Sequence, residues 1–195
     1  MRTLIIAAAL TFGVWQCADA AYIHVKAILA QYLLEQAWLE TKLDGQGRKP
    51  WPWADTTPVA RLRLARLGVD QIVLSGDSGR VLAFGPGWAE SSAEIGASGT
   101  AVISGHRDTH FDFLQNLILG DVVELESRER HVSYKVVNTA IVDASEARLF
   151  ADSELAQLKL VTCYPFHAVA PGGPLRFVVT AVLQKSQDAE SSLDR

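Results

Sequence analysis

LKLVTCYPF, the stretch from Leu158 to Phe166, joins a short run of strand-forming residues to a cysteine. The apolar and β-branched residues before Cys163 favour a strand, and the Tyr164-Pro165 pair ends it because proline has no backbone N–H to donate. A cysteine in this place is either a small buried residue or a nucleophile presented at the rim of a sheet. The residues elsewhere in the chain have to distinguish these two possibilities.

Similar short runs, separated by turn residues, recur along the chain from about residue 58 onward. Alternating and continuous apolar patterns predict strands at 59–64, 69–74, 99–106, 121–127, 131–143, 158–163 and 175–183. HFDFLQNL and DSELAQL are expected to form short helices, and the Gly- and Ser-rich segment 85–99 a flexible loop. About eight strands with little helix predict an all-β domain, a closed or nearly closed β-barrel over residues 58–184.

The N-terminal segment has a different character. An apolar run follows Arg2 and continues to about residue 23, broken by Gln16 and Asp19. This length is close to the ~20 residues that span a bilayer, so we expect a membrane anchor over residues 1–23 with Arg2 on the inner side. The alternative is a signal peptide cut after the small-x-small sequence at 18–20. In both cases the folded domain is expected outside the cytoplasm.

Residues 24–57 are expected to join this segment to the barrel. Apolar residues at helical spacing predict a stalk helix up to about Leu43, and a linker rich in Gly, Pro and Trp follows it. Trp51 and Trp53 in this linker either dock on the domain or rest at a membrane surface. The last segment, 185–195, is a polar tail.

Composition excludes some classes of function. The 195 residues carry a formal net charge of -4 with no block of Lys or Arg, so nucleic acid is not an expected partner. Of the two cysteines, Cys17 lies in the N-terminal apolar run, which leaves Cys163 as the thiol of the folded domain. There is therefore no disulfide framework.

Three chemically capable residues lie at ends of predicted strands. His106 ends one run, Cys163 ends another, and Arg176 lies early in the last. A thiol reacts as the thiolate, which a neighbouring histidine or cation favours, and an arginine can stabilise the oxyanion formed during acyl transfer. The spacing alone leaves open whether the three side chains meet.

Three motifs in this order carry a resemblance. SGHRDTHF at Ser104–Phe111, KLVTCYPF at Lys159–Phe166 and PLRFVV at Pro174–Val179 together resemble the sortase family of cysteine transpeptidases. The entry KPWPWADTTPVARL and the GPGW at Gly85–Trp88 further resemble the small proteobacterial sortases, the class GN type. The resemblance implies an eight-stranded barrel with the active site in a groove on its face. It also implies cleavage of an LPxTG-like sorting signal between Thr and Gly, and transfer of the acyl group to an amine.

Carried over to this chain, the resemblance makes Cys163 the nucleophile, His106 the general acid/base and Arg176 the oxyanion or substrate-positioning residue. Thr162 corresponds to the threonine before the nucleophile, and we expect it to bind substrate. One departure is Lys159, where the family motif has a threonine. By strand alternation Lys159 shares a face with Cys163, so its ammonium either favours the thiolate or lies in solvent.

The partners that follow are a secreted protein with a C-terminal LPxTG-like signal, an amine acceptor that the sequence does not identify, and the membrane. No cofactor and no metal are expected. His106, Asp108 and His110 alternate and could be interpreted as metal ligands, but no further cluster completes a shell. Asp108 could instead orient His106, and His167 is a reserve candidate for the acid/base. A hydrolytic cysteine peptidase and a non-catalytic envelope module that binds peptides are the alternative functions.

Overall fold

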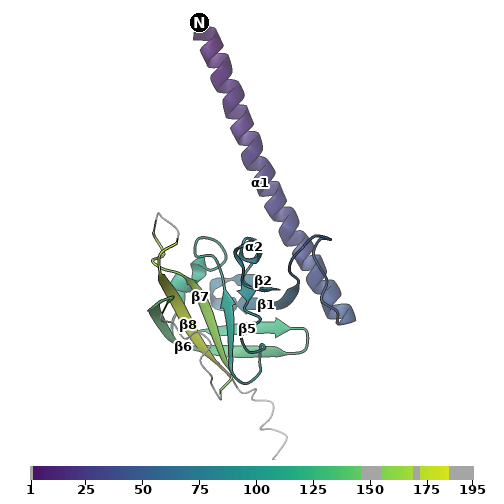
Figure 1. The fold of residues 1–195 in the computed structure, drawn as a ribbon, viewed down its shortest axis with the longest axis vertical. Helices are drawn as coiled ribbons and strands as arrows, with labels where there is room; N and C mark the ends of the chain where they lie inside the picture. Colours follow the sequence, from purple (N-terminus) through teal and green to yellow (C-terminus); the bar gives the residue numbers. More distant parts are fainter. Residues whose placement is uncertain (1, 146–154, 169–171, 185–195) are drawn as a thin grey trace, which may run out of the picture.

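Eight strands close into a barrel in the computed structural model, which describes residues 2–145, 155–168 and 172–184 (Figure 1). The order around the barrel is β1-β2-β3-β4-β7-β8-β6-β5. The strands are β1 (Pro58–Leu64), β2 (Val69–Ser75), β3 (Gly87–Trp88), β4 (Thr100–Ser104), β5 (Val122–Ser127), β6 (His131–Asp143), β7 (Gln157–Cys163) and β8 (Leu175–Leu183). The helices are α1 (Arg2–Asp44), α2 (Gly79–Leu82) and the two 3-10 turns η1 (Ala65–Leu67) and η2 (Asp112–Asn116). The predicted all-β barrel is confirmed.

Alternating side chains build the core of the barrel. In β1, which reads PVARLRL, every second residue is buried and the residues between are half-buried. The buried set points inward, where Leu62, Leu125 and Leu160 are fully inaccessible to solvent. Tyr134 is also fully buried, and its hydroxyl accepts a hydrogen bond from the Gly96 N–H at 2.8 Å. The loop between β3 and β4 is thereby fastened to the interior of the barrel.

Two pairs of neighbouring strands run parallel, β2 with β3 and β4 with β7, and the other pairs are antiparallel. The β4–β7 pair matters most for function because parallel neighbours end at the same edge of a sheet. Ser104 at the end of β4 is in register with Val161 in β7. The segments that follow β4 and β7 therefore leave the barrel side by side.

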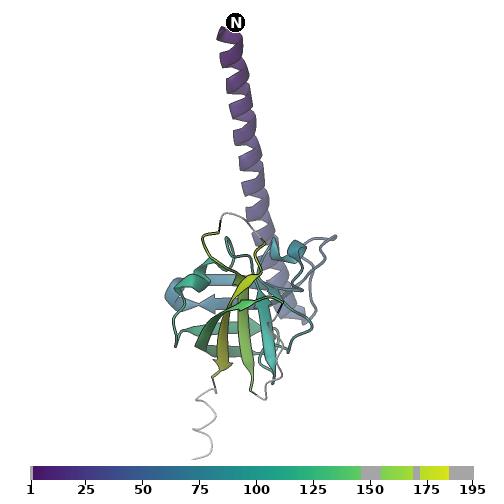
Figure 2. The same cartoon turned by 60° about the vertical axis from the view of Figure 1, so that its left-hand side comes forward.

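The segments expected to form the anchor and the stalk lie on one continuous helix, α1. It runs unbroken from Arg2 to Asp44 and projects from the barrel (Figures 1 and 2). In its C-terminal part Leu34 and Trp38 pack against Ile72, Leu74 and Val81 on the outside of the barrel. The predicted apolar stripe is thus buried only at this end, because the barrel covers no more of the helix.

The part of α1 before the barrel presents large apolar side chains to solvent, with Leu10 65%, Trp15 63% and Ile23 68% exposed. In the part of the chain that the structure describes, no helix has the combination of length and apolarity that crossing a bilayer requires. The membrane anchor expected over residues 1–23 stays a prediction.

The linker after α1 contains one docked and one exposed tryptophan. The Trp51 ring makes an edge contact with the Phe84 ring at a centroid distance of 5.0 Å, whereas Trp53 is 80% exposed. Three elements were not predicted: η1, α2 and the two-residue strand β3, which lies in the segment expected to be a loop. The helix expected within DSELAQL falls partly outside the described residues, and its last residues belong to β7.

Candidate functional site

Cys163 is the last residue of β7, and alternation decides which way it faces. Leu158 and Leu160 point into the core, so Cys163 faces the outside of the barrel together with Lys159 and Val161. Cys163 is half-buried and free of any disulfide. It therefore lies at the rim of the sheet on the outer face, as a reactive residue would.

Arg176 is the direct neighbour of Cys163 across the antiparallel β7–β8 pair. Side chains of directly opposed residues lie on the same face, so both are on the outside of the barrel. The Arg176 guanidinium donates from Nη1 to the carbonyls of Gly173 at 2.7 Å and Leu175 at 2.9 Å. The backbone at the start of β8 thereby restricts the side chain of Arg176.

His106 reaches the same rim from β4. The β4–β7 pairing continues past Ser104, because the Gly105 N–H donates to the Val161 carbonyl at 3.0 Å. The Thr162 hydroxyl then donates to the Gly105 carbonyl at 2.7 Å. His106 is the next residue and is exposed, so the backbone brings it alongside Cys163. The structure thus gathers Cys163, His106 and Arg176 at one end of three adjacent strands.

Thr162 occupies a different place from the one expected of a residue that binds substrate. It is 2% exposed and points into the barrel, opposite to Cys163, because neighbouring residues in a strand face opposite sides. Its hydroxyl is engaged with the Gly105 carbonyl. This position favours a role in holding the loop that carries His106, rather than a side-chain contact with the substrate.

Arg107, which the sequence gave no reason to single out, is 7% exposed and lies beside the site. Its guanidinium donates to the Pro165 carbonyl at 2.6 Å and the Ala168 carbonyl at 2.9 Å, both in the turn after Cys163. It also binds both carboxylate oxygens of Asp108, at 2.6 and 2.9 Å. These contacts connect segments 58 and 61 residues apart along the chain, so no local sequence signal announces them.

The charges around this turn influence one another. The pKa of Asp108 is lowered, chiefly by its hydrogen bonds from Arg107 and to a smaller extent by the charge of His106. The pKa of Arg107 is raised, chiefly by Asp108, with a smaller contribution from Cys163. The carboxylate of Asp108 is therefore bound by Arg107, which disfavours the alternative in which it orients His106.

The remaining histidines differ in environment. His110 is half-buried, and its pKa is lowered by burial first and by the charge of His106 second, although a hydrogen bond to the Ala83 backbone opposes this. His167 is exposed in the turn after Cys163. Within the described ranges, no three His, Cys, Asp or Glu side chains are grouped closely enough to hold a metal ion. The metal site considered at residues 106–110 therefore has no support.

An apolar strip leads away from Cys163 along the outside of the barrel. It consists of Ala89, Val102, Val161 and Val178, which are all buried, with Val142 packed against them; we call it the outer-face strip. Lys159 is half-buried farther along β7, in register with Val102 and Thr180, and burial lowers its pKa. The strip therefore packs beneath the surface between Lys159 and Cys163.

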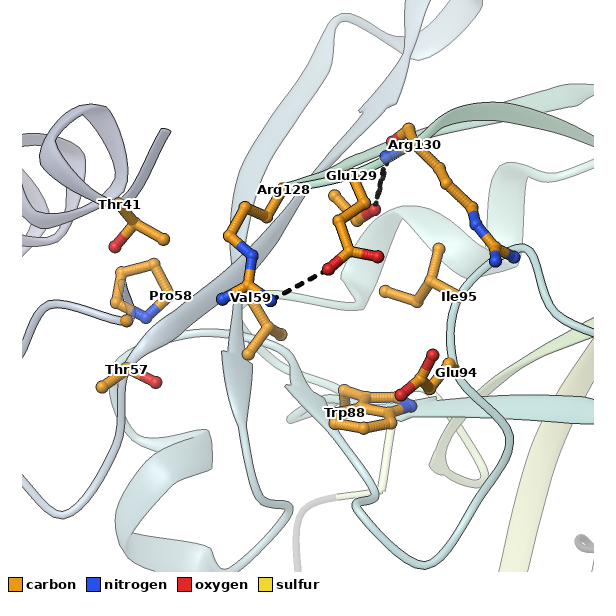
Figure 3. Close-up of a pocket in the computed structure, with 12 residues that line it drawn as sticks. Thr41, Thr57, Pro58, Val59, Trp88, Glu94, Ile95, Arg128, Glu129 and Arg130 are labelled. Atoms are coloured by element: carbon orange, nitrogen blue, oxygen red, sulfur yellow. Dashed lines mark hydrogen bonds and ion pairs between the residues drawn. The ribbon is translucent and has the colours of Figure 1, made fainter. Parts of the chain in front are cut away.

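A cavity of about 240 Å³ lies elsewhere, between the end of α1, the β3–β4 loop and the β5–β6 hairpin (Figure 3). Carboxylates and guanidinium groups line it together, and the Arg128 guanidinium donates to Glu129 at 3.0 Å. Cys163, His106 and Arg176 are not among the residues that line it. This cavity is therefore separate from the candidate active site.

A model of the sortase domain matches residues 62–184, which is most of the barrel and more than half of the chain. The chain belongs to the sortase family. Sortase D of Bacillus subtilis (strain 168) is 30% identical to this sortase over 119 residues, which are 60% of each protein. The chain thus spans less than two thirds of the length of this relative.

Solved sortase structures share the fold. A Clostridium perfringens Sortase D5 transpeptidase superposes with a TM-score of 0.66 at 19% identity, covering 80% of this chain and 99% of that one. Sortase A from Corynebacterium diphtheriae superposes with a TM-score of 0.61 at 24% identity, covering 71% of this chain and 66% of that one. The family assignment from the three motifs is confirmed, while the narrower resemblance to proteobacterial sortases stays a prediction.

Proposed function

We propose that this sortase cleaves an LPxTG-like sorting signal between Thr and Gly and joins the threonine carbonyl to an amine. The Cys163 thiolate attacks the carbonyl carbon, and Arg176 stabilises the oxyanion that forms. The C–N bond then breaks as His106 protonates the leaving amine, which leaves a thioester on Cys163. An acceptor amine attacks the thioester, His106 takes its proton, and the thiolate is regenerated.

The register of the strand ends is the observation that carries this proposal. Cys163 and Arg176 are directly opposed across β7 and β8, and the continued β4–β7 pairing brings His106 to the same rim. Cys163 and Arg176 are thus presented from strands, and His106 follows β4 in a loop whose first residue, Gly105, is hydrogen-bonded to β7. Groups held on or directly beside strands are positioned more precisely than groups on free loops. Such positioning supplies much of the rate in reactions that join two substrates.

Family membership supports the class of substrate, because a sortase acts on a protein that carries a sorting signal. The side chains of the outer-face strip are already buried in the free protein. Pockets for the apolar Leu and Pro side chains of the signal would therefore be formed by other residues around Cys163. The signal would belong to a secreted protein, and we propose that the barrel acts outside the cytoplasm.

Mass spectrometry of the protein mixed with an LPxTG peptide tests this proposal. We expect a thioacyl adduct on the wild type and none on Cys163→Ala. Cys17→Ala is the matched control, because it removes the other thiol, which is exposed on α1, and should keep the adduct. An adduct on Cys163→Ala would refute the assignment of the nucleophile.

Product analysis then identifies the fate of the thioester. With an added amine, such as a glycine peptide, the transpeptidase produces the joined peptide, whereas a hydrolytic peptidase releases only the free acid. If the wild-type protein forms no adduct although its thermal melting curve shows that it is folded, the result would instead indicate a non-catalytic module.

A further inference from the structure

We propose that Arg107 is a positioning residue that joins the loop carrying His106 to the turn following Cys163 and places a buried positive charge near the thiolate. This inference rests on the proposed role of Cys163 as nucleophile. Arg107 follows His106 directly in the chain, yet its side chain is bound to the backbone after Cys163. It therefore connects the acid/base to the nucleophile through a route independent of the sheet.

The hydrogen bonds explain why an arginine stands here. Nη1 donates to the Pro165 carbonyl, Nη2 donates to the Ala168 carbonyl, and Nε and Nη2 share the Asp108 carboxylate. Only a planar, multi-donor group can serve three acceptors in fixed directions at once. A lysine would keep the charge and lose most of these contacts.

Asp108 neutralises the charge of Arg107 only in part, because the two side chains differ in their exposure to solvent. The guanidinium side chain is 7% exposed, whereas the Asp108 side chain that pairs with it is 67% exposed. Water therefore screens the negative partner far more than the positive one. Cys163 contributes to the raised pKa of Arg107, so the thiol and the guanidinium interact electrostatically. A nearby cation favours the thiolate, the form in which a cysteine attacks.

Alkylation of Cys163 by iodoacetamide, followed against pH in a Cys17→Ala background, tests the charge without requiring sortase activity. We expect the midpoint of the pH–rate curve to move up in Arg107→Gln, because the substitution removes a cation that favours the thiolate. Asp108→Asn should move it in the opposite direction, because it removes the neutralising carboxylate. Its side chain is largely exposed, so this variant should still fold if Arg107→Gln does not.

Arg66→Gln is the matched control. Arg66 makes a similar two-bond pair with Asp121, at 2.6 Å for both bonds, and donates to the Asn116 carbonyl at 2.7 Å. This pair belongs to η1 and the segment before β5, away from the residues of the candidate site. The control should leave the alkylation midpoint at the wild-type value.

The positioning role has its own readout in transpeptidation kinetics. Arg107→Lys keeps the charge but loses the planar set of N–H donors, so the alkylation midpoint should remain near that of the wild type. Its kcat should fall about tenfold or more with little change in KM, because a displaced reacting group slows the chemical step. An unchanged midpoint in both Arg107→Gln and Asp108→Asn, or a kcat for Arg107→Lys equal to that of Arg66→Gln, would overturn the inference. If Cys163→Ala keeps activity, the proposed function fails instead, whatever the alkylation midpoints.

Discussion

Replacing Gly105 by alanine should damage both the stability and the catalytic rate of this sortase. Gly105 lies between β4 and His106 and is held by Val161 on one side and Thr162 on the other. A Cβ at this position would lie 2.6, 2.7 and 2.9 Å from three ring carbons of Phe111. Real contacts of this kind are near 3.5–4.0 Å, so the ring or the loop has to move by about 1 Å.

Neither the Phe111 ring nor the loop at Gly105 can move freely, and this determines how much stability the substitution costs. Phe111 is fully buried in the barrel core and packs edge-on against Phe113 at a centroid distance of 5.6 Å. Overpacking of this kind costs about 1–3 kcal/mol in the free energy of unfolding. A loss of about 2 kcal/mol lowers the Tm of a chain of this size by roughly 4–8 °C. If the loop moves instead of the ring, His106 is displaced and kcat/KM falls up to about 100-fold.

Thermal unfolding by calorimetry and transpeptidation kinetics measure the two effects. Gly79→Ala is the matched control, because a Cβ at Gly79 would meet no atom within 4 Å. It should change the free energy of unfolding by less than about 0.5 kcal/mol. A Gly105→Ala variant with the Tm and kcat/KM of the control would refute the reasoning that close packing on Phe111 places the His106 loop.

Three further outcomes are expected. Arg176→Lys should lower kcat/KM by about 100- to 1,000-fold across a pH series without changing the shape of the profile, since lysine keeps the charge and loses the fork; loss of one limb of the profile would contradict this role. Thr162→Val should lower the free energy of unfolding in urea titrations by about 1–2 kcal/mol, because it leaves the Gly105 carbonyl without the hydroxyl donor, and Thr162→Ser should recover most of it. Asp121→Asn should be less stable than wild type at pH 7, with the difference disappearing in acid. Arg66 lowers the pKa of Asp121 below its unfolded value near 3.9, so the pair stabilises above that pH and its contribution is lost as pH falls through the folded-state pKa; a difference that persists at pH 2 in the same titrations would contradict it.

The barrel was predictable because most of its strands carry their own pattern. β1 shows strict alternation, and β7 and β8 show apolar runs bounded by Gly and Pro. β3 shows neither, since it has only two residues and exists through its neighbours β2 and β4. Gly87 is the sequence signal for β3, because the backbone of β3 approaches that of Gly76 very closely. A Cβ at Gly87 would lie 2.1 Å from the Gly76 carbonyl oxygen, so only glycine permits this approach.

The candidate site divides in the same way. Cys163, His106 and Arg176 could be predicted as candidates from motifs, because reactive side chains at strand ends have a recognisable chemistry. Arg107 was missed, and the buried orientation of Thr162 was not used, because their partners are backbone carbonyls. A carbonyl is present at every residue and carries no sequence signal, so contacts of this kind emerge only once the chain is folded.

The contacts between α1 and the barrel fix the orientation of the helix relative to the barrel. Gln31 donates to the Phe84 carbonyl and Glu35 pairs with Arg61, so the C-terminal part of the helix cannot rotate on the barrel. The part before Gln31 is roughly 40 Å long and projects away from the barrel (Figure 1). The length of α1 therefore sets the distance, and its helical phase the direction, from the start of the helix to the barrel that carries Cys163. One residue inserted into α1 before Gln31 would move the barrel by about 1.5 Å along the helix axis and turn it by about 100° relative to the start of the helix. Seven inserted residues would lengthen the helix by about 10 Å and nearly restore the original direction of the barrel.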